Sequence, residues 1–150
     1  MKIRKANTSD SRAIFQLIKC YADCDLMLFK PLFEIYESIR DFYVIEENNE
    51  IVACCALELY WEGLGEIRSL AVKEDFHGKG LGKKIVEACT KEAIDLKIEK
   101  VFALTYKEKF FAKLGFNEVD KNDMPQKIWA QCVNCSKFPD CNEICMIKDL

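Results

Sequence analysis

The chain of 150 residues has few of the residues that break regular structure and no large excess of either charge. It contains only six glycines and three prolines. This composition excludes a collagen-like or largely disordered chain. The formal net charge of -3 at pH 7 leaves no broad basic surface, so binding of nucleic acid or of an anionic membrane is not expected.

Long apolar runs are also missing. The first ten residues, MKIRKANTSD, lack the apolar stretch of a secretory signal, and no run approaches the roughly 18 apolar residues of a transmembrane helix. We therefore expect a cytoplasmic protein without a membrane partner. A chain of this length buries enough surface to fold without metal or disulfides, and we expect a single domain over residues 1–150.

Cysteine, in contrast, is abundant, with nine residues. In a reducing compartment, thiols pack as small apolar groups, bind metal or react more often than they form structural disulfides. Five of the nine fall in segments with a helix or strand pattern, which favours packing: Cys20, Cys24, Cys54, Cys55 and Cys89.

The other four, Cys132, Cys135, Cys141 and Cys145, follow the spacing C-x2-C-x5-C-x3-C near the C-terminus. Three lie in a cysteine-rich connection at about 121–141, and the fourth lies in the last expected strand. Structural zinc sites usually join two C-x(2-4)-C knuckles across a longer loop, and only one such knuckle is present here. A zinc site, packed thiols and a redox-labile pair all remain open, and we assign no metal ligand.

Hydrophobic periodicity predicts the order β-α-α-β-β-β-α-β-α-β-β, which is a mixed α/β sheet packed by helices. The helices begin at Asn7 or Thr8, at about 31, near Gly80 and at about 108, because each segment shows apolar residues at helical spacing or a start signal. The first has Ile14, Leu17, Ile18 and Tyr21 on one buried face, and the second is expected over 31–41. The expected strands are 2–6, 42–47, 50–61, 66–72, 100–106, 116–120 and 144–149. Gly63 and Gly65 are expected to break the chain before the strand at 66.

The segment HGKGLG (77–82) joins the strand at 66–72 to the following helix. The start of a helix leaves backbone N–H groups unpaired, and the glycines Gly78, Gly80 and Gly82 give phosphate oxygens room to approach them. The spacing fits neither G-x-G-x-x-G nor G-x-x-x-x-G-K-[ST], so the two commonest phosphate loops are excluded.

The pattern L-A-V-x(4)-H-G-K-G-L-G resembles the acetyl-CoA site of the GCN5-related N-acetyltransferases, whose signature is [Q/R]-x-x-G-x-[G/A] directly after a strand. FFAKLGF (110–116) resembles their second recurrent segment, and the element order is similar over essentially the whole chain. The resemblance implies a mixed, mostly antiparallel sheet with a bulged strand, flanking helices, and acetyl-CoA as co-substrate.

The resemblance also implies roles for particular residues. Backbone groups of Leu70 and Val72 would bind the pantetheine arm, with the Leu70 amide near the thioester oxygen, and amides of His77 to Lys83 would hold the pyrophosphate. The cofactor-binding residues it implies are Leu70, Ala71, Val72, His77, Gly78, Lys79, Gly80, Leu81, Gly82 and Lys83.

Glu66 falls where some family members have a glutamate base that takes a proton from the attacking amine. A carboxylate in a partly dry cleft can have its pKa raised toward neutrality. A salt bridge of a strand-end carboxylate with Arg68 or a lysine explains Glu66 equally well.

Two positions depart from the family pattern. His77 replaces the usual Arg or Gln, and as the chain's only histidine it is expected to be a solvated loop residue beside the phosphates. Phe111 stands where many members have a tyrosine that protonates the departing thiolate. Either Tyr106 takes this role or solvent does, and Tyr106 also fits a packing role at the end of a strand.

Several linked segments, among them IYESIRDFYV and the tail from VDKNDMPQKIW onward, resemble the short, stand-alone bacterial N-acetylglutamate synthases. This resemblance implies acetylation of the α-amine of L-glutamate, the first step toward arginine, and leaves a homodimer open. Two substrate carboxylates need cationic partners. Arg68 and Lys127 are the candidate substrate-binding residues, with Lys30 and Arg40 in segments that also border the site.

Arg68 is expected to share one face of its strand with Glu66 and Leu70, because alternate residues of a strand point to the same side. A surface charge remains an alternative for each cation. Two other functions stay open: acetylation of another small amine or a protein N-terminus, and a zinc-stabilised interaction module on the same fold.

Overall fold

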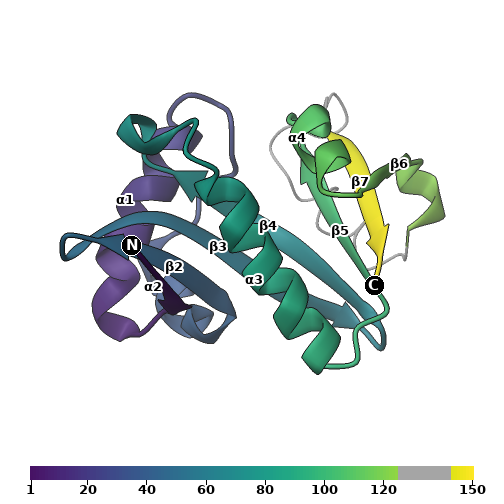
Figure 1. Ribbon diagram of the computed structural model, residues 1–150, viewed down its shortest axis with the longest axis horizontal. Coiled ribbons are helices and arrows are strands. Elements are labelled where there is room, and N and C mark those ends of the chain that lie inside the picture. Colours follow the sequence, from purple (N-terminus) through teal and green to yellow (C-terminus); the bar gives the residue numbers. More distant parts are fainter. Residues whose placement is uncertain (125–142) are drawn as a thin grey trace.

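The computed structural model describes residues 1–124 and 143–150. The order of strands and helices follows the predicted order (Figure 1). The elements are β1 (Lys2–Lys5), α1 (Ser11–Ala22), α2 (Leu32–Glu37), β2 (Phe42–Glu47), β3 (Glu50–Trp61), β4 (Leu64–Val72), α3 (Leu81–Asp95), β5 (Lys100–Thr105), α4 (Glu108–Lys113), β6 (Asn117–Val119) and β7 (Ile144–Asp149). Short 3₁₀ turns occupy Thr8–Asp10, Ile39–Asp41, Glu74–Phe76 and Lys121–Asp123.

The strands form one seven-stranded sheet in the order β1-β2-β3-β4-β5-β7-β6. Within the part of the chain that the structure describes, only the β4–β5 pair is parallel, and the other pairs are antiparallel. The mixed, mostly antiparallel sheet expected from the sequence is therefore confirmed. Its one parallel junction is the place where the site lies.

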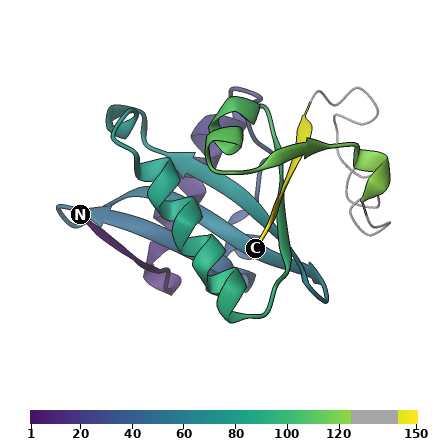
Figure 2. The same ribbon diagram turned by 45° about the vertical axis from the view of Figure 1, so that its right-hand side comes forward.

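Helices cover both faces of the sheet. α1 and α2 pack on one face, over an apolar cluster that includes Ile14, Ile18 and Ile35. α3 packs on the other face, over a cluster that includes Ile85 and Val86 (Figure 2). Strands β3 and β4 lie between the two clusters, which explains why β3 is apolar over most of its length rather than alternating.

Two predicted boundaries were wrong. The strand expected at 66 begins at Leu64, because Gly65 lies within it, and a Cβ at Gly65 would come within 3.2 Å of the Glu58 carbonyl oxygen. Of the two glycines expected to interrupt the chain, Gly63 alone, at φ +79°, lies in the turn between β3 and β4. The helix expected over 31–41 stops at Glu37, and a separate 3₁₀ turn follows it.

A bulge interrupts β4 opposite Cys55. The register pairs Cys54 with Ala71 and Ala56 with Arg68, so two residues of β4 face one of β3. Ser69, one of these two residues, has φ +55°, in the left-handed region that one residue adopts in bulges of the G1 type. The bulged strand that the family resemblance implied is thus present.

Candidate active site

Strands β4 and β5 pair only at their beginnings. The pairing runs from Leu64 and Lys100 to Glu66 and Phe102, and beyond that point the two strands diverge (Figure 1). A cavity of about 1520 Å³ lies along the opening, lined by both strands, by the segment between α1 and α2, by the turn before α3 and by α4. The closed end of this cleft is at Glu66.

The edge of β4 presents backbone groups to the cleft. Lys73 N–H donates to the Val52 carbonyl at 2.8 Å, and alternate residues of an antiparallel strand direct their groups to opposite edges. The N–H and C=O of Val72 therefore point away from β3. Strand-edge groups that point away from the neighbouring strand suit an amide-bearing arm such as pantetheine.

The three glycines of the turn have different roles. Gly78 and Gly80 both have φ +77°, and a Cβ built at either one meets no atom within 4 Å. Gly82 instead allows a close approach, since a Cβ there would lie 3.2 Å from Cε1 and Cζ of Phe110. The first two therefore leave open space beside the start of α3, and the third lets α4 pack against it.

Most of the expected cofactor residues line the cavity. They are Leu70, Val72, His77, Gly78, Gly80, Leu81, Gly82 and Lys83. Ala71 is buried in the cluster under α1, and the Lys79 ammonium lies 4.9 Å from the centroid of the Phe76 ring. The open turn, the basic side chains beside it and the strand edge fit the phosphates and the pantetheine of acetyl-CoA.

Glu66 is a buried carboxyl group at the closed end of the cleft, with 5% of its surface exposed. Burial raises its pKa from 4.5 to about 7, while the Arg68 charge and a hydrogen bond with Tyr60 act in the opposite direction. A group with this pKa is half ionised near neutral pH, which is where a general base is most effective.

Arg68 lies on the same face as Glu66 and carries an ion pair with Glu58, Nη1 to Oε2 at 2.8 Å. The ammonium of Lys30 lies 3.8 Å from the other oxygen of Glu58 and 5.5 Å from the Phe42 ring centroid. Lys30 is 8% exposed and lines the cavity, as do Glu58 and Arg68. Two cations and one carboxylate thus surround the space next to Glu66.

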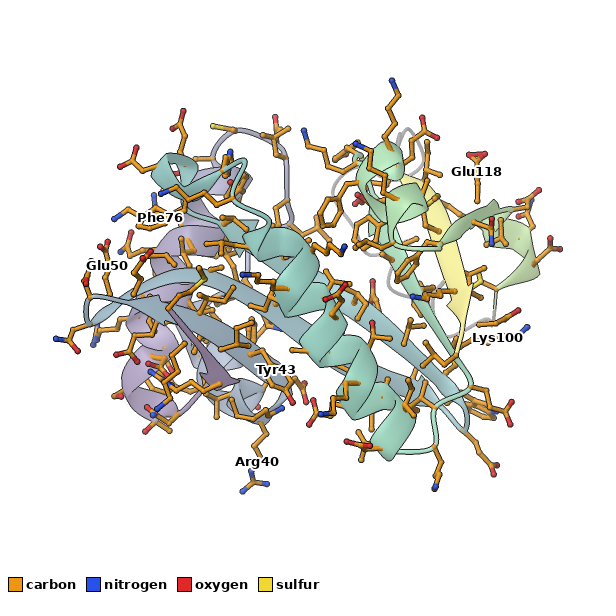
Figure 3. All side chains as sticks on the ribbon, in the orientation of Figure 1. Arg40, Tyr43, Glu50, Phe76, Lys100 and Glu118 are labelled. Carbon is orange, nitrogen blue, oxygen red and sulfur yellow. The ribbon has the colours of Figure 1, made fainter. Side chains whose placement is uncertain are left out.

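Leu70 does not share the face of Arg68 and Glu66, contrary to the sequence prediction. Its side chain packs in the cluster under α3, together with Ile67 and Val72. The bulge at Ser69 shifts the alternation by one residue, so that simple counting fails beyond Arg68. Arg40 is exposed and projects away from the sheet, on the side opposite to Phe76 (Figure 3), so it does not join the site.

Sequence reasoning missed Glu58 and Tyr60. Glu58 is paired directly with Glu66 across β3 and β4, and Tyr60 Oη lies 3.3 Å from Glu58 Oε2. Burial raises the pKa of Tyr60 and the two nearby carboxylates raise it further, so its hydroxyl stays protonated. Counting the residue pairs of β3 with β4 from the turn before Leu64 would have predicted that both residues lie near the site.

Tyr106 lines the cavity just beyond the end of β5. Phe111 is 4% exposed and packs edge-on against Phe110 and Phe116 with ring centroids 5.1 Å apart. The position of the usual tyrosine is therefore occupied by a core ring that also borders the cavity.

Three expected features lie wholly or partly outside the described residues. They are Lys127, the cysteines Cys132, Cys135 and Cys141, and most of the cysteine-rich connection. Cys145, in β7, is buried beside Tyr60, Phe102 and Met124. Within 1–124 and 143–150, no three His, Cys, Asp or Glu side chains are arranged to hold a metal ion.

The sequence pattern of the Acetyltransferase (GNAT) family matches residues 11–116. The chain belongs to this family. It is 40% identical to an uncharacterized N-acetyltransferase of Chlorobaculum tepidum over 148 residues, covering 99% of this chain and 96% of that protein. It is 38% identical to the amino-acid acetyltransferase of Mycobacterium tuberculosis over 130 residues, covering 85% and 74% of the two chains. No helix among the described residues is long and apolar enough to span a membrane.

Solved structures agree with this family. A M. tuberculosis protein in complex with CoA and NLQ superposes with a TM-score of 0.87 at 32% identity, over 100% of this chain and 99% of that one. N-acetylglutamate synthase from Neisseria gonorrhoeae, complexed with coenzyme A and N-acetyl-glutamate, has the same fold, with a TM-score of 0.92 at 22% identity over 99% of this chain and 35% of that one. The GNAT protein described here is an N-acetyltransferase with acetyl-CoA as co-substrate.

Proposed function

We propose that this GNAT enzyme transfers the acetyl group of acetyl-CoA to the α-amine of a free amino acid, with L-glutamate as the preferred acceptor. The observation that carries the proposal is the position of Glu66, a buried carboxyl with a pKa of about 7, beside the cations Arg68 and Lys30. A base and carboxylate-binding groups at one end of an acetyl-CoA cleft are what an amino-acid acceptor requires.

Glu66 is the proposed base. The acceptor arrives as an ammonium ion, which has no lone pair, and Glu66 takes a proton from it directly or through a water molecule. The amine nitrogen then forms a bond to the thioester carbon, the bond from that carbon to sulfur breaks, and the nitrogen loses its second proton to solvent, which leaves a neutral amide. The departing thiolate gains a proton from Tyr106 or from solvent.

Cofactor binding is proposed to use the backbone. Strand-edge groups of Leu70 and Val72 hold the pantetheine arm, and the Leu70 amide lies near the thioester oxygen. Amides from His77 to Lys83 hold the pyrophosphate at the start of α3, where the helix dipole favours negative charge. The open space beside Gly78 and Gly80 supports this placement.

Arg68 and Lys30 are proposed to bind the acceptor carboxylates. Both line the cavity, and a guanidinium suits a bidentate contact with a carboxylate. Lys127 is proposed as a further partner, on the sequence resemblance alone. The names of the relatives support an amino-acid acceptor, and the N-acetyl-glutamate in the N. gonorrhoeae complex supports glutamate. With this acceptor the enzyme would act in the cytoplasm in the first step toward arginine.

The test is an acetyl-transfer screen over the free amino acids and a peptide N-terminus. Products should be followed by mass spectrometry, because the nine thiols of the chain would react with thiol-detecting reagents. We expect N-acetylglutamate as the main product. Product from the peptide alone, or no product above the background rate, would contradict the acceptor assignment.

Two variants connect the screen to the site. Glu66→Gln should reduce kcat at least a hundredfold, in the range for loss of a general base. Glu62→Gln is the matched control, because Glu62 is exposed in the turn before β4, and its kcat should be unchanged. Arg68→Ala should lose glutamate turnover while acetyl-CoA binding stays intact.

A further inference from the structure

The carbonyl of Val72 is held by two side chains from distant parts of the chain. The Tyr21 hydroxyl, at the end of α1, lies 2.5 Å from this oxygen, and Nε2 of His77 lies 2.8 Å from it. The two side chains are also 2.7 Å apart, with their rings stacked at 27° and 6.4 Å between centroids. We call this arrangement of Tyr21, His77 and the Val72 carbonyl the latch.

The contacts define where the protons lie. Tyr21 Oη has one proton, and the carbonyl oxygen can only accept. If Tyr21 donated to His77, Nε2 would be unprotonated and would face the carbonyl oxygen at 2.8 Å with no proton between them. The consistent arrangement has Tyr21 donating to Val72 O and His77 carrying a proton on Nε2.

The latch acts on the edge of β4 that faces the cleft. Since the backbone groups of Val72 point away from β3 and β5 has already diverged, this carbonyl has no strand partner in the β4–β5 pairing. Two donors now satisfy it. The N–H of Val72 is then the group left to bind the pantetheine arm, rather than the carbonyl.

The latch also fixes the turn that leads to the phosphate site. His77 has extended backbone angles, φ -65° and ψ 151°, and Gly78 follows it in the left-handed region. A Cβ at Gly78 or Gly80 would meet nothing within 4 Å, so packing alone does little to hold this part of the turn. The His77 side chain therefore supplies a restraint that glycine residues cannot.

We infer that Tyr21 and His77 are positioning residues for acetyl-CoA, which hold the β4 edge and the phosphate turn in their binding geometry before the co-substrate arrives. A preorganised site binds more tightly because less ordering occurs on binding. The His77 side chain is directed toward Tyr21 and the Val72 carbonyl, and only its backbone is left for the pyrophosphate. This inference extends the proposed cofactor contacts and does not depend on the identity of the acceptor.

The experiment measures the Kd of CoA by calorimetry, without an acceptor, for the full chain. Tyr21→Phe removes one hydrogen bond and should raise Kd about 3- to 10-fold, the range for a neutral hydrogen bond. Tyr36→Phe is the matched control, because Tyr36 is exposed on α2, and its Kd should equal that of the wild type. A Kd for Tyr21→Phe within twofold of the wild-type value would overturn the inference.

Variants at His77 test the second half of the latch. His77→Gln keeps an N–H donor and should stay within about twofold of the wild-type Kd, whereas His77→Leu should bind as weakly as Tyr21→Phe. Equal weakening by Gln and Leu would contradict a donor role.

Steady-state kinetics separate positioning from general destabilisation. In Tyr21→Phe the KM for acetyl-CoA should rise, while the KM for the amine and kcat stay near wild-type values. An equal rise of both KM values would overturn the inference. If the wild type binds CoA but acetylates no amino acid, the proposed acceptor is wrong and the calorimetric test still stands.

Discussion

Arg68 Nη1 lies 2.8 Å from Glu58 Oε2, so the cation proposed to bind the acceptor already has an anionic partner within the protein. Lys30 lies near the same carboxylate. Burial raises the pKa of Glu58, but Arg68 and Lys30 outweigh it and the net direction is downward, so Glu58 is ionised at neutral pH. Glu58 thus offsets one of the two positive charges that face the acceptor.

Removing the negative charge of Glu58 should change the selectivity of the enzyme for its acceptor. In Glu58→Gln the two cations keep their positions but lose an anionic competitor, so an acceptor with two carboxylates gains more than one with a single carboxylate. We expect the ratio of kcat/KM for glutamate to that for glutamine to rise about 5- to 10-fold, roughly 1 kcal/mol. An unchanged ratio would show that Glu58 does not act on the acceptor charge. Glu62→Gln is again the control.

The pH dependence of turnover should report the ionisation of Glu66. Below a pH of about 7 this carboxyl holds a proton and cannot accept another, so kcat/KM for the amine should fall about tenfold for each pH unit. The ionisation of the amine itself also contributes to the profile. Because the charge of Glu58 raises the pKa of Glu66, the profile of Glu58→Gln should shift to lower pH, and the amine contribution is the same in both enzymes.

The same pKa predicts a cost in stability. The folded-state pKa of Glu66, about 7, is above its value of 4.5 in the unfolded chain, so the folded state retains a proton between these limits that the unfolded state has lost. The free energy of unfolding therefore falls as pH rises from 4.5 to 7, by on the order of 3 kcal/mol from this group. Glu66→Gln should be more stable than wild type at pH 8, but not at pH 4.5, in urea titrations. Equal differences at both pH values would contradict a buried carboxyl with a raised pKa.

Local sequence patterns predicted most of the helices and strands. They did not predict the features that depend on how one strand pairs with the next. The alternation in β4 correctly placed Glu66 and Arg68 on one face, but it failed at Leu70 because the bulge at Ser69 adds a residue. The family resemblance implied a bulged strand, but no pattern in the sequence marks the residue at which the bulge falls. The partnership of Arg68 with Glu58 likewise depends on the pairing of β3 with β4, which the composition of either strand alone does not define.

The latch shows a second limit of sequence reasoning. Tyr21 was expected only as part of the apolar face of a helix, and His77 as a solvated loop residue. His77 is indeed exposed, but its ring bonds to a residue 56 positions away in sequence. A contact of this kind depends on how α1 packs across β4, and hydrophobic periodicity in the sequence does not predict that arrangement.

Gly82 should be sensitive to a single added methyl group. A Cβ there would lie 3.2 Å from the Phe110 ring and 4.0 Å from Val72 Cγ2, so the Phe110 ring, or α4 with it, must shift in Gly82→Ala. We expect the Kd of CoA to rise several-fold and the protein to lose on the order of 1 to 3 kcal/mol of stability, as in other overpacked cores. Phe110→Leu removes the Cε1 and Cζ atoms involved, so the double variant Gly82→Ala/Phe110→Leu should recover CoA binding relative to Gly82→Ala. No recovery would mean that the clash is not with Phe110.

Thiol reactivity should divide the described cysteines into two groups. Cys20 and Cys24 are exposed, contrary to the packing role that their helical pattern favoured, whereas Cys54, Cys55, Cys89 and Cys145 are buried. Burial raises the pKa of the Cys54 thiol to about 12, and the Cys89 thiol together with burial raises the pKa of Cys55, so neither forms the reactive thiolate readily.

Alkylation with iodoacetamide at pH 7.5, followed by peptide mapping, should label Cys20 and Cys24 in the folded protein and the buried thiols only after denaturation in urea. The denatured sample is the control for intrinsic reactivity. Cys54 Sγ donates to the Ser69 carbonyl at 3.4 Å, directly at the bulge. Labelling of Cys54 faster than global unfolding would therefore show that the bulge opens locally, and labelling as fast as that of Cys20 would contradict its burial.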